Sequence, residues 1–201
     1  GQCKQVKNIA DDPSREFKVS RADMAAATIC GLEAIIHSHP DYPDCPSASD
    51  MRGQELSGVP WGIVATNGID ATDICWFGDQ VEKQPLIGRG FRHGVTDCYA
   101  LIRDYYKSEL GIELINFHRD WDWWNNGGDL YRDGIKPAGF RVIDQSEAKP
   151  GDMWIAQVRS PVPNHGGILL DNGLALHHPS AKNPVDAAQL SRREPIERWL
   201  P

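Results

Sequence analysis

The sequence predicts an α+β fold that is divided into two domains. Short helix and strand patterns alternate in the first half, whereas the second half opens with an amphipathic helix and continues with strand and hairpin patterns. Between the halves, residues 78–90 form a polar stretch punctuated by Gly and Pro, which is typical of a connector. We place the boundary near Pro85, so the predicted domains are 1–85 and 86–201.

Two capped helices and three strands are expected in the first domain. Ser20 is followed three residues later by Asp23, and Ser47 by Asp50, which is the spacing of a capping box at a helix start. Three short apolar runs predict strands. The expected elements are helices over 20–30 and 47–56 and strands over 34–39, 62–66 and 73–77.

The second domain is expected to open with a helix that carries a cysteine in its first turn. Apolar or aromatic residues recur within 97–110 at the spacing of one helix face, and Gly111 is a suitable stop. The recurring residues are Cys98, Leu101, Ile102 and Tyr105. Further along, a Pro-Gly turn precedes a strand over 153–158, and the turn 171–173 joins two strands of a hairpin.

Composition excludes several classes of protein. A formal charge of −7 argues against a general nucleic-acid binder, which needs a concentrated basic surface. No apolar run is long enough for a membrane span, and no signal segment opens the chain, so we expect a soluble protein that is not exported by its own signal. Five cysteines without C-x-x-C pairs indicate a reducing compartment rather than a disulfide scaffold or a zinc ribbon.

Cys98 is the candidate nucleophile. Unpaired backbone N–H groups and the helix dipole stabilise a thiolate at a helix N-terminus, so we expect the pKa of Cys98 to be depressed. Catalysis also needs a base and a group that orients the base, for which His165 and His177 are the candidates. The alternative is that a cysteine on an apolar helix face is simply a small core residue.

The spacing of His165 and His177 allows them to meet. If Gly173 is left-handed in a three-residue hairpin loop, Leu170 pairs with Leu174 and Gly167 with His177. His165 is then a diagonal neighbour on the same face, about 7–8 Å away between backbones. A two-residue loop would instead put the two histidines on opposite faces.

His37 and His39 are the candidate metal ligands, together with Asp50. They lie two apart on a predicted strand, so both imidazoles leave the same face, and Asp50 follows in the first turn of the next helix. Two histidines, one carboxylate and an open position are typical of a catalytic zinc site. Spacing alone leaves open the alternative of an exposed histidine pair beside an ordinary capping box.

The second half resembles the NlpC/p60-type cysteine peptidases. The resemblance lies in four strings, His93-Gly94-Val95-Thr96-Asp97-Cys98-Tyr99, the turn Pro150-Gly151-Asp152 before a strand, Asn164-His165-Gly166-Gly167-Ile168 and Leu176-His177-His178. It implies a papain-like domain, a cysteine helix packed on an antiparallel sheet, that hydrolyses the γ-D-glutamyl–diamino acid bond of peptidoglycan stem peptides. Cys98 would be the nucleophile, His165 the base and His177 the orienting residue, with an N–H near the helix start stabilising the oxyanion. Adjacency alone suggests that Asp97 helps to orient the site.

The first half resembles the JAMM (MPN-type) metal-dependent isopeptidases. The string His37-Ser38-His39-Pro40 followed by Ser47-Ala48-Ser49-Asp50 matches their motif, which implies an α/β sandwich that binds zinc through His37, His39 and Asp50. The family also uses a glutamate well upstream as general base. Neither Glu16 nor Glu33 suits that position, so we expect a domain that is incomplete at its N-terminus and predict metal binding rather than hydrolysis.

The order of the two halves, first JAMM-like and then NlpC/p60-like, resembles that of the tail-tip assembly proteins of lambda-like bacteriophages. The expected partners are then peptidoglycan stem peptides and other tail-tip proteins, and the expected location is the host cytoplasm during assembly or the virion tail tip. Three functions stay open: an active murein peptidase, a structural tail protein with inactive sites, and an isopeptidase acting through the metal site. The first is favoured by the complete set of Cys98, His165 and His177.

Overall fold

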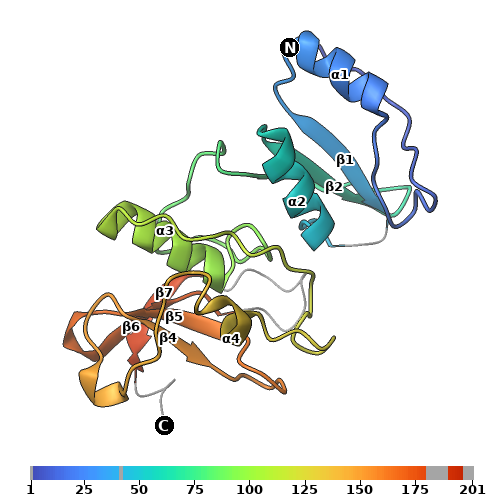
Figure 1. Cartoon of the computed structure of the whole chain (residues 1–201). Helices are drawn as coiled ribbons and strands as arrows, with labels where there is room; N and C mark the ends of the chain where they lie inside the picture. Colours follow the sequence, from blue (N-terminus) through green and yellow to red (C-terminus); the bar gives the residue numbers. More distant parts are fainter. Residues whose placement is uncertain (1, 41–42, 180–189, 197–201) are drawn as a thin grey trace. The chain divides into compact units, whose positions relative to one another are not determined.

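The chain forms two compact units, Gly1–Glu82 and Lys83–Pro201, each with its own sheet and helices (Figure 1). A computed structural model describes residues 2–40, 43–179 and 190–196. The division lies close to the boundary that the sequence suggests near Pro85. The predicted α+β class is confirmed, with a three-stranded sheet in the first unit and a four-stranded sheet in the second.

The first unit builds a mixed sheet in the order β1-β2-β3. Strands β1 and β2 are parallel, which requires a crossover, and α2 provides it; β2 and β3 are antiparallel. Both predicted caps are present, since Ser20 and Ser47 each accept a backbone N–H from the third residue of the following turn. The elements are α1 (Arg21–Ile29), β1 (Ile35–Pro40), α2 (Ala48–Ser57), β2 (Trp61–Thr66) and β3 (Cys75–Phe77).

Helix α2 packs against the sheet through a close contact with Trp61. A Cβ atom at Gly53 would lie 2.6 Å from the Trp61 ring, so glycine is what allows helix and strand to approach here. The buried residues of this core include Met51, Ile63 and Phe77. The packing fixes the first turn of α2, which carries Asp50, relative to β1, which carries His37 and His39.

The second unit packs one long helix on an antiparallel sheet in the order β4-β5-β6-β7. Helix α3 lies along this sheet (Figure 1), and Leu101, Ile102 and Ile168 are fully buried between them. The predicted cysteine helix and its sheet are therefore confirmed. The elements are α3 (Cys98–Leu110), α4 (Leu130–Gly134), β4 (Met153–Ala156), β5 (His165–Leu169), β6 (Leu174–His177), β7 (Arg192–Pro195) and the short 3-10 turns Gln145–Glu147 and Asp171–Gly173.

The hairpin between β5 and β6 has the register that the three-residue loop predicts. Gly167 pairs with His177, and the Leu170 N–H donates to the carbonyl oxygen of Leu174. Gly173 is left-handed with φ of 67°, and so is its neighbour Asn172 with φ of 61°. The two histidines consequently lie on the same face of the sheet.

Three elements of the second unit lie outside the sequence predictions, α4, β7 and the 3-10 turn Gln145–Glu147. Helix α4 follows residues 121–124, a Trp-rich segment whose sequence has no clear period, and β7 completes the sheet at the edge of β6. The strand expected over 153–158 ends earlier, at Ala156.

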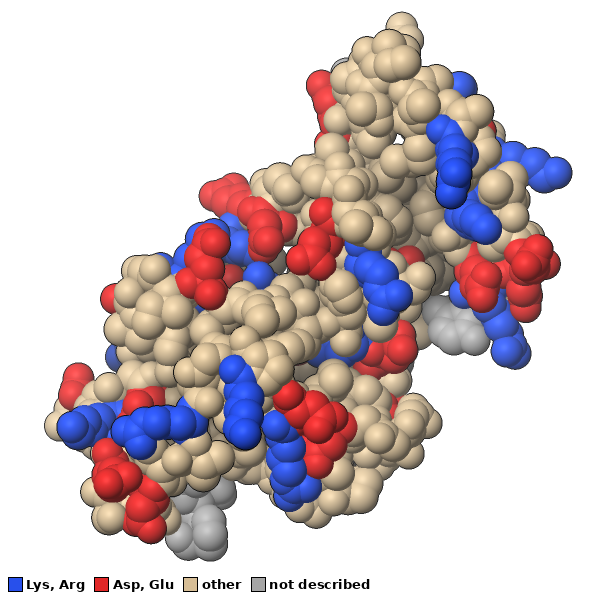
Figure 2. Space-filling view, viewed as in Figure 1, with Lys and Arg blue, Asp and Glu red and all other residues tan. Residues whose placement is uncertain are grey.

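The charged side chains are interspersed on the face shown in Figure 2. Lys and Arg alternate there with Asp and Glu, and the described residues of this face form no continuous basic surface. Among the described residues, no helix combines the length and the apolar character that a membrane crossing requires.

Candidate functional site

Cys98 is the first residue of α3, and Asp97 is the N-cap that fixes this helix start. The Asp97 carboxylate accepts the Ala100 N–H at 2.9 Å and the Gly94 N–H at 2.7 Å. One side chain thus ties the first turn of α3 to the loop before it. The sequence suggestion that Asp97 orients the site has a structural basis in these bonds, although Asp97 acts on the helix and not on a histidine of the predicted triad.

Arg119 pairs with Asp97 behind the cysteine. The guanidinium binds the carboxylate through two hydrogen bonds of 2.8 and 2.9 Å, and both residues are almost wholly buried. Burial by itself would raise the pKa of Asp97, but the charge and hydrogen bonds of Arg119 outweigh burial and hold this pKa well below its usual range. Sequence patterns did not single out Arg119, because it lies in a stretch without periodicity.

His165 and His177 meet as the hairpin spacing predicts. His165 Nε2 lies 3.1 Å from His177 Nδ1, and the rings are 5.3 Å apart between centroids. On the other side of His177, its Nε2 lies 3.4 Å from the carboxylate of Glu194, which also receives a 2.6 Å contact from Arg192. The polar chain therefore extends from His165 through His177 to Glu194 on β7, a residue that the sequence did not indicate.

One cavity of about 310 Å³ brings Cys98 and His165 together. It is lined mainly by aromatic and apolar side chains, with Arg159 and Arg192 among its polar residues. His177 is fully buried and lies behind His165, in the place of an orienting group. Since Nε2 of His165 is engaged by His177, Nδ1 is the ring nitrogen that could take a proton from the thiol.

The expected depressed pKa of Cys98 is wrong. Burial raises the pKa of Cys98 to about 11, and the negative charge of Asp97 beside it acts in the same direction. Burial also lowers the pKa of His165 to about 3, with the neighbouring histidines contributing. Both shifts favour the neutral thiol and the neutral imidazole near neutral pH, in a side chain of Cys98 that is partly buried.

We expect slow alkylation of Cys98 in the folded protein as a result. At pH 7.5, iodoacetamide should modify the exposed Cys3 and Cys30 before Cys98, and the Cys98 rate should rise about tenfold per pH unit toward about pH 11. Mass spectrometry of peptides from a timed reaction would give each rate. Faster labelling of Cys98 than of Cys30 at pH 7.5 would instead indicate a resting thiolate–imidazolium pair.

Tyr131 contacts the Cys98 sulfur directly. Its hydroxyl oxygen lies 3.2 Å from Sγ. The backbone of Gly166 also hydrogen-bonds the Cys98 side chain. Tyr131 belongs to α4, which no sequence pattern indicated, so sequence reasoning missed it. Tyr131 follows a polar stretch without periodicity, three residues after Gly128, so no sequence pattern marks it as part of a site.

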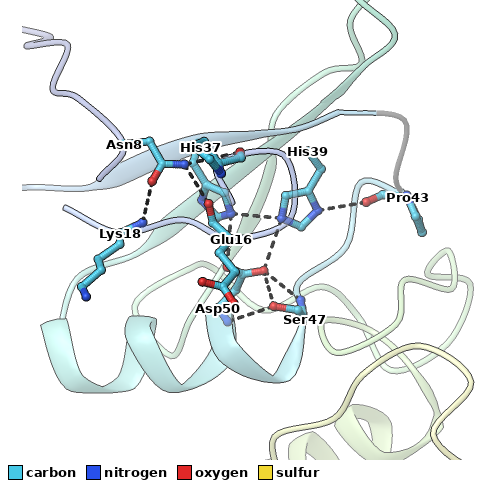
Figure 3. Close-up of polar contacts among 9 residues, drawn as sticks. Asn8, Glu16, Lys18, His37, His39, Pro43, Ser47 and Asp50 are labelled. Atoms are coloured by element: carbon cyan, nitrogen blue, oxygen red, sulfur yellow. Dashed lines mark hydrogen bonds and ion pairs between the residues drawn. The ribbon is translucent and has the colours of Figure 1, made fainter. Parts of the chain in front are cut away.

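The three predicted metal ligands of the first unit converge. The Nε2 atoms of His37 and His39 are 3.0 Å apart, and they lie 3.2 and 3.3 Å from the two carboxylate oxygens of Asp50 (Figure 3). Ligand atoms about 2.0–2.1 Å from a tetrahedral zinc ion are themselves about 3.3 Å apart. The donor set and its spacing therefore fit zinc.

Neighbouring groups hold these ligands in place. His39 Nδ1 lies 3.3 Å from the Pro43 carbonyl oxygen, so a proton on Nδ1 leaves the Nε2 lone pair directed at the cluster. The Ser47 N–H and hydroxyl donate to Asp50 at 2.9 and 2.7 Å. The capping box and the cluster of ligands are thus both present and share Asp50, whereas the histidines are not an exposed pair, since His37 is buried.

The electrostatics of Asp50 suit a ligand. Burial opposes its ionisation, but hydrogen bonds with His37, His39 and Ser47 hold the pKa of Asp50 well below its usual range. Glu16 and Glu33, the upstream glutamates, do not belong to the group of ligand atoms found among the described residues. A general base is not a metal ligand, so the expectation that this half lacks a suitable general base stays a prediction.

A thiol at the first turn of a helix, in one cavity with a histidine that a second histidine orients, is the arrangement of a cysteine hydrolase. The chain belongs to the NlpC/P60 family, whose model matches residues 88–200, and membership implies a hydrolase of the cysteine peptidase type. No solved structure gives a significant match.

Two curated proteins are similar over most of the chain. It is 40% identical to tail tip assembly protein K of Escherichia phage lambda over 169 residues, which cover 84% of this chain and 77% of that protein. It is 36% identical to tail tip assembly protein K of Escherichia phage N15 over 175 residues, which cover 86% of this chain and 70% of that protein. Both alignments extend well beyond the part matched by the family model.

Proposed function

We propose that this chain is a phage tail-tip assembly protein that cleaves peptidoglycan stem peptides at the γ-D-glutamyl–diamino acid bond. The observation that carries the proposal is the single cavity in which Cys98, at the start of α3, and His165, bonded to His177, meet. The similarity to two tail tip assembly proteins supports the biological setting, with other tail-tip proteins as partners. Its location would be the host cytoplasm during assembly or the virion tail tip.

The reaction proceeds by acyl transfer to sulfur. Because thiol and imidazole are both neutral at rest, the proton passes from Cys98 Sγ to His165 Nδ1 as sulfur bonds to the scissile carbonyl carbon. The imidazolium then gives this proton to the leaving amine, and an acyl-enzyme remains. Water, losing a proton to His165, attacks the acyl carbon; the thiol is then released with that proton and the carboxylate product departs.

His177 and Glu194 assist by stabilising the imidazolium. His177 Nδ1 is close to His165 Nε2, and the Glu194 carboxylate lies beyond His177 Nε2, so the positive charge that forms on His165 faces a polar chain ending in a negative charge. This is the role of the third residue in serine and cysteine peptidase triads.

The cleavage itself is tested with purified peptidoglycan. We expect incubation with the protein to release fragments whose new amino terminus is a diamino acid and whose other half ends in D-glutamate. Mass spectrometry before and after amine labelling identifies both ends. Fragments cut at another stem-peptide bond would reassign the specificity, and no release by freshly reduced protein would favour a structural tail protein.

We further propose that His37, His39 and Asp50 hold one zinc ion. The fit of their spacing to tetrahedral zinc and the bonds from Ser47 and Pro43 that orient them support this binding. A bound zinc ion would supply Lewis acidity at that site. An isopeptidase activity of the JAMM type is the alternative function, and it would also need a general base to take a proton from a metal-bound water.

Replacing His39 with alanine should remove the metal. We expect elemental analysis to find about one zinc per chain in wild-type protein prepared without chelator and none after His39→Ala, since two remaining ligands bind zinc weakly. His118→Ala, a histidine change in the other unit, serves as the matched control and should keep the metal. Equal zinc content in the wild type and His39→Ala would eliminate this site.

Zinc removal should leave peptidoglycan cleavage largely unchanged. Thiolate attack needs no metal, and the ligands and Cys98 belong to different units. Circular dichroism of the chelated protein would confirm that the first unit stays folded. Loss of cleavage in a chelated but folded protein would contradict independent sites.

A further inference from the structure

We propose that Tyr131 is a catalytic residue of the cysteine site: its hydroxyl holds the Cys98 sulfur at rest and donates a hydrogen bond to the carbonyl oxygen as the tetrahedral intermediate forms. The inference rests on the proposed acyl transfer to Cys98. The observation behind it is the 3.2 Å distance between Tyr131 Oη and Cys98 Sγ, a direct contact with the predicted nucleophile. It also gives a function to α4, which the predicted triad does not use.

The Tyr131 ring is held rigidly in this position. The residue is 6% exposed and belongs to the buried cluster of the second unit. Its ring packs edge-on against Tyr99 with centroids 6.2 Å apart, and at the same distance against Trp123. Aromatic neighbours on two sides leave the hydroxyl little freedom, which is what electrostatic catalysis requires of a hydrogen-bond donor.

The hydroxyl lies close to both the nucleophile and the strand that carries the base. A Cβ atom added at Gly166, the residue after His165, would lie 3.2 Å from Tyr131 Oη and 2.9 Å from the Trp154 carbonyl oxygen. Only a glycine at this position leaves the tyrosine hydroxyl this close to β5. The donor is therefore within the same small volume as Cys98 and the backbone beside His165.

Tyr131 keeps its proton throughout the reaction. Burial raises the pKa of Tyr131 well above its usual value, and the proximity of Cys98 acts in the same direction. The phenol is therefore neutral near pH 7, and its O–H can donate to sulfur or to a developing oxyanion. A neutral donor avoids placing a second negative charge beside the intermediate.

The geometry suits an oxyanion donor. Such a donor must lie about 2.7–3.1 Å from the position that the oxyanion occupies. That oxygen is bonded to the carbon that sulfur attacks, so a hydroxyl 3.2 Å from sulfur can donate to it by turning its O–H bond while the ring stays in place. The backbone N–H of Cys98, at a helix position that has no partner within the helix, is a candidate second donor.

Tyr131→Phe tests the proposal, with Tyr106→Phe as matched control. Both changes remove one buried hydroxyl, but that of Tyr106 donates to the Gly151 carbonyl oxygen at 2.9 Å, and Tyr106 does not line the cavity. We expect Tyr131→Phe to lower kcat for peptide release about 10²- to 10³-fold with KM within about threefold, as for other oxyanion donors. Tyr106→Phe should stay within about threefold of wild type in both.

A second measurement separates this proposal from the identity of the substrate. Acylation of Cys98 by p-nitrophenyl acetate passes through the same kind of tetrahedral intermediate, and Cys98→Ala gives the background. We expect Tyr131→Phe to slow this acylation at least tenfold while slowing iodoacetamide alkylation, which forms no oxyanion, by less than threefold.

The outcomes are distinguishable. A wild type that is acylated at Cys98 but releases nothing from peptidoglycan would overturn the proposed substrate and leave Tyr131 to be judged by acylation. Acylation of Tyr131→Phe within threefold of Tyr106→Phe would overturn the catalytic role. Equal losses of acylation and alkylation would also overturn it, since the hydroxyl would then only tune the thiol. Thermal melting of both variants controls for folding.

Discussion

Replacing Cys98 with alanine is expected to abolish peptidoglycan cleavage, with a loss of at least about 10³-fold, because no other group can form the acyl-enzyme. The change deletes only the sulfur atom, at a residue whose backbone is fixed by the Asp97 cap. The fold should therefore survive. Release of labelled stem peptides, measured alongside circular dichroism, checks both statements.

Cys30→Ala is the matched control for this experiment. Cys30 is an exposed thiol in the first unit, so its removal should leave cleavage within about twofold of wild type. A Cys98→Ala protein that still releases peptides at the wild-type rate would exclude thiol catalysis at this site, and the hydrolysis would have to be sought at the candidate metal ligands.

Replacing Arg119 with alanine is expected to destabilise the second unit by about 3–5 kcal/mol. The change leaves the Asp97 carboxylate buried without its cationic partner, which is the costly way to break a buried ion pair. It also loosens the start of α3. Urea unfolding followed by hydrogen exchange of peptides from α3 would assign the loss to this unit.

The loss of stability in Arg119→Ala should depend on pH. Asp97 has a depressed pKa in the folded protein, so its contribution to stability is complete above its unfolded pKa of about 3.9 and is lost as the pH falls toward the folded value. Without Arg119, burial raises the pKa of Asp97 in the folded variant, so the difference between the wild type and Arg119→Ala should be largest near pH 7 and shrink as the pH falls, beginning above the unfolded pKa of about 3.9. Lys107→Ala, which breaks the exposed pair with Glu113, should cost about 0–1 kcal/mol at any of these pH values.

Local patterns were sufficient for most of the fold. The capping residues Ser20, Ser47 and Asp97 each start a helix where the sequence indicates one, and Gly111 ends α3 in the left-handed region. The hairpin register followed from one assumption about Gly173. Strand β7 could not be foreseen in this way, because its pairing with β6 is a long-range contact and its sequence, Arg-Arg-Glu-Pro, has neither a strand period nor an apolar face.

The candidate sites were predictable where spacing within one element determines geometry. His37 and His39 share a strand face, and His165 and His177 share a hairpin, so their convergence follows from period and register. Tertiary packing, and not local spacing, brings three other residues to the cysteine site. They are Arg119, Tyr131 and Glu194, and the sequence did not indicate them. The pKa of Cys98 was misjudged for a related reason, since the helix position was visible in the sequence and the burial was not.

The contact between Glu194 and His177 has a consequence for the order in which the protein is made. During translation Cys98, His165 and His177 all leave the ribosome before β7, so a nascent chain holds the three predicted catalytic side chains without the last negative charge or the edge strand that covers β6. The proposed hydrolase would gain its full polar chain from His165 to Glu194 only after β7 has been made and has paired with β6.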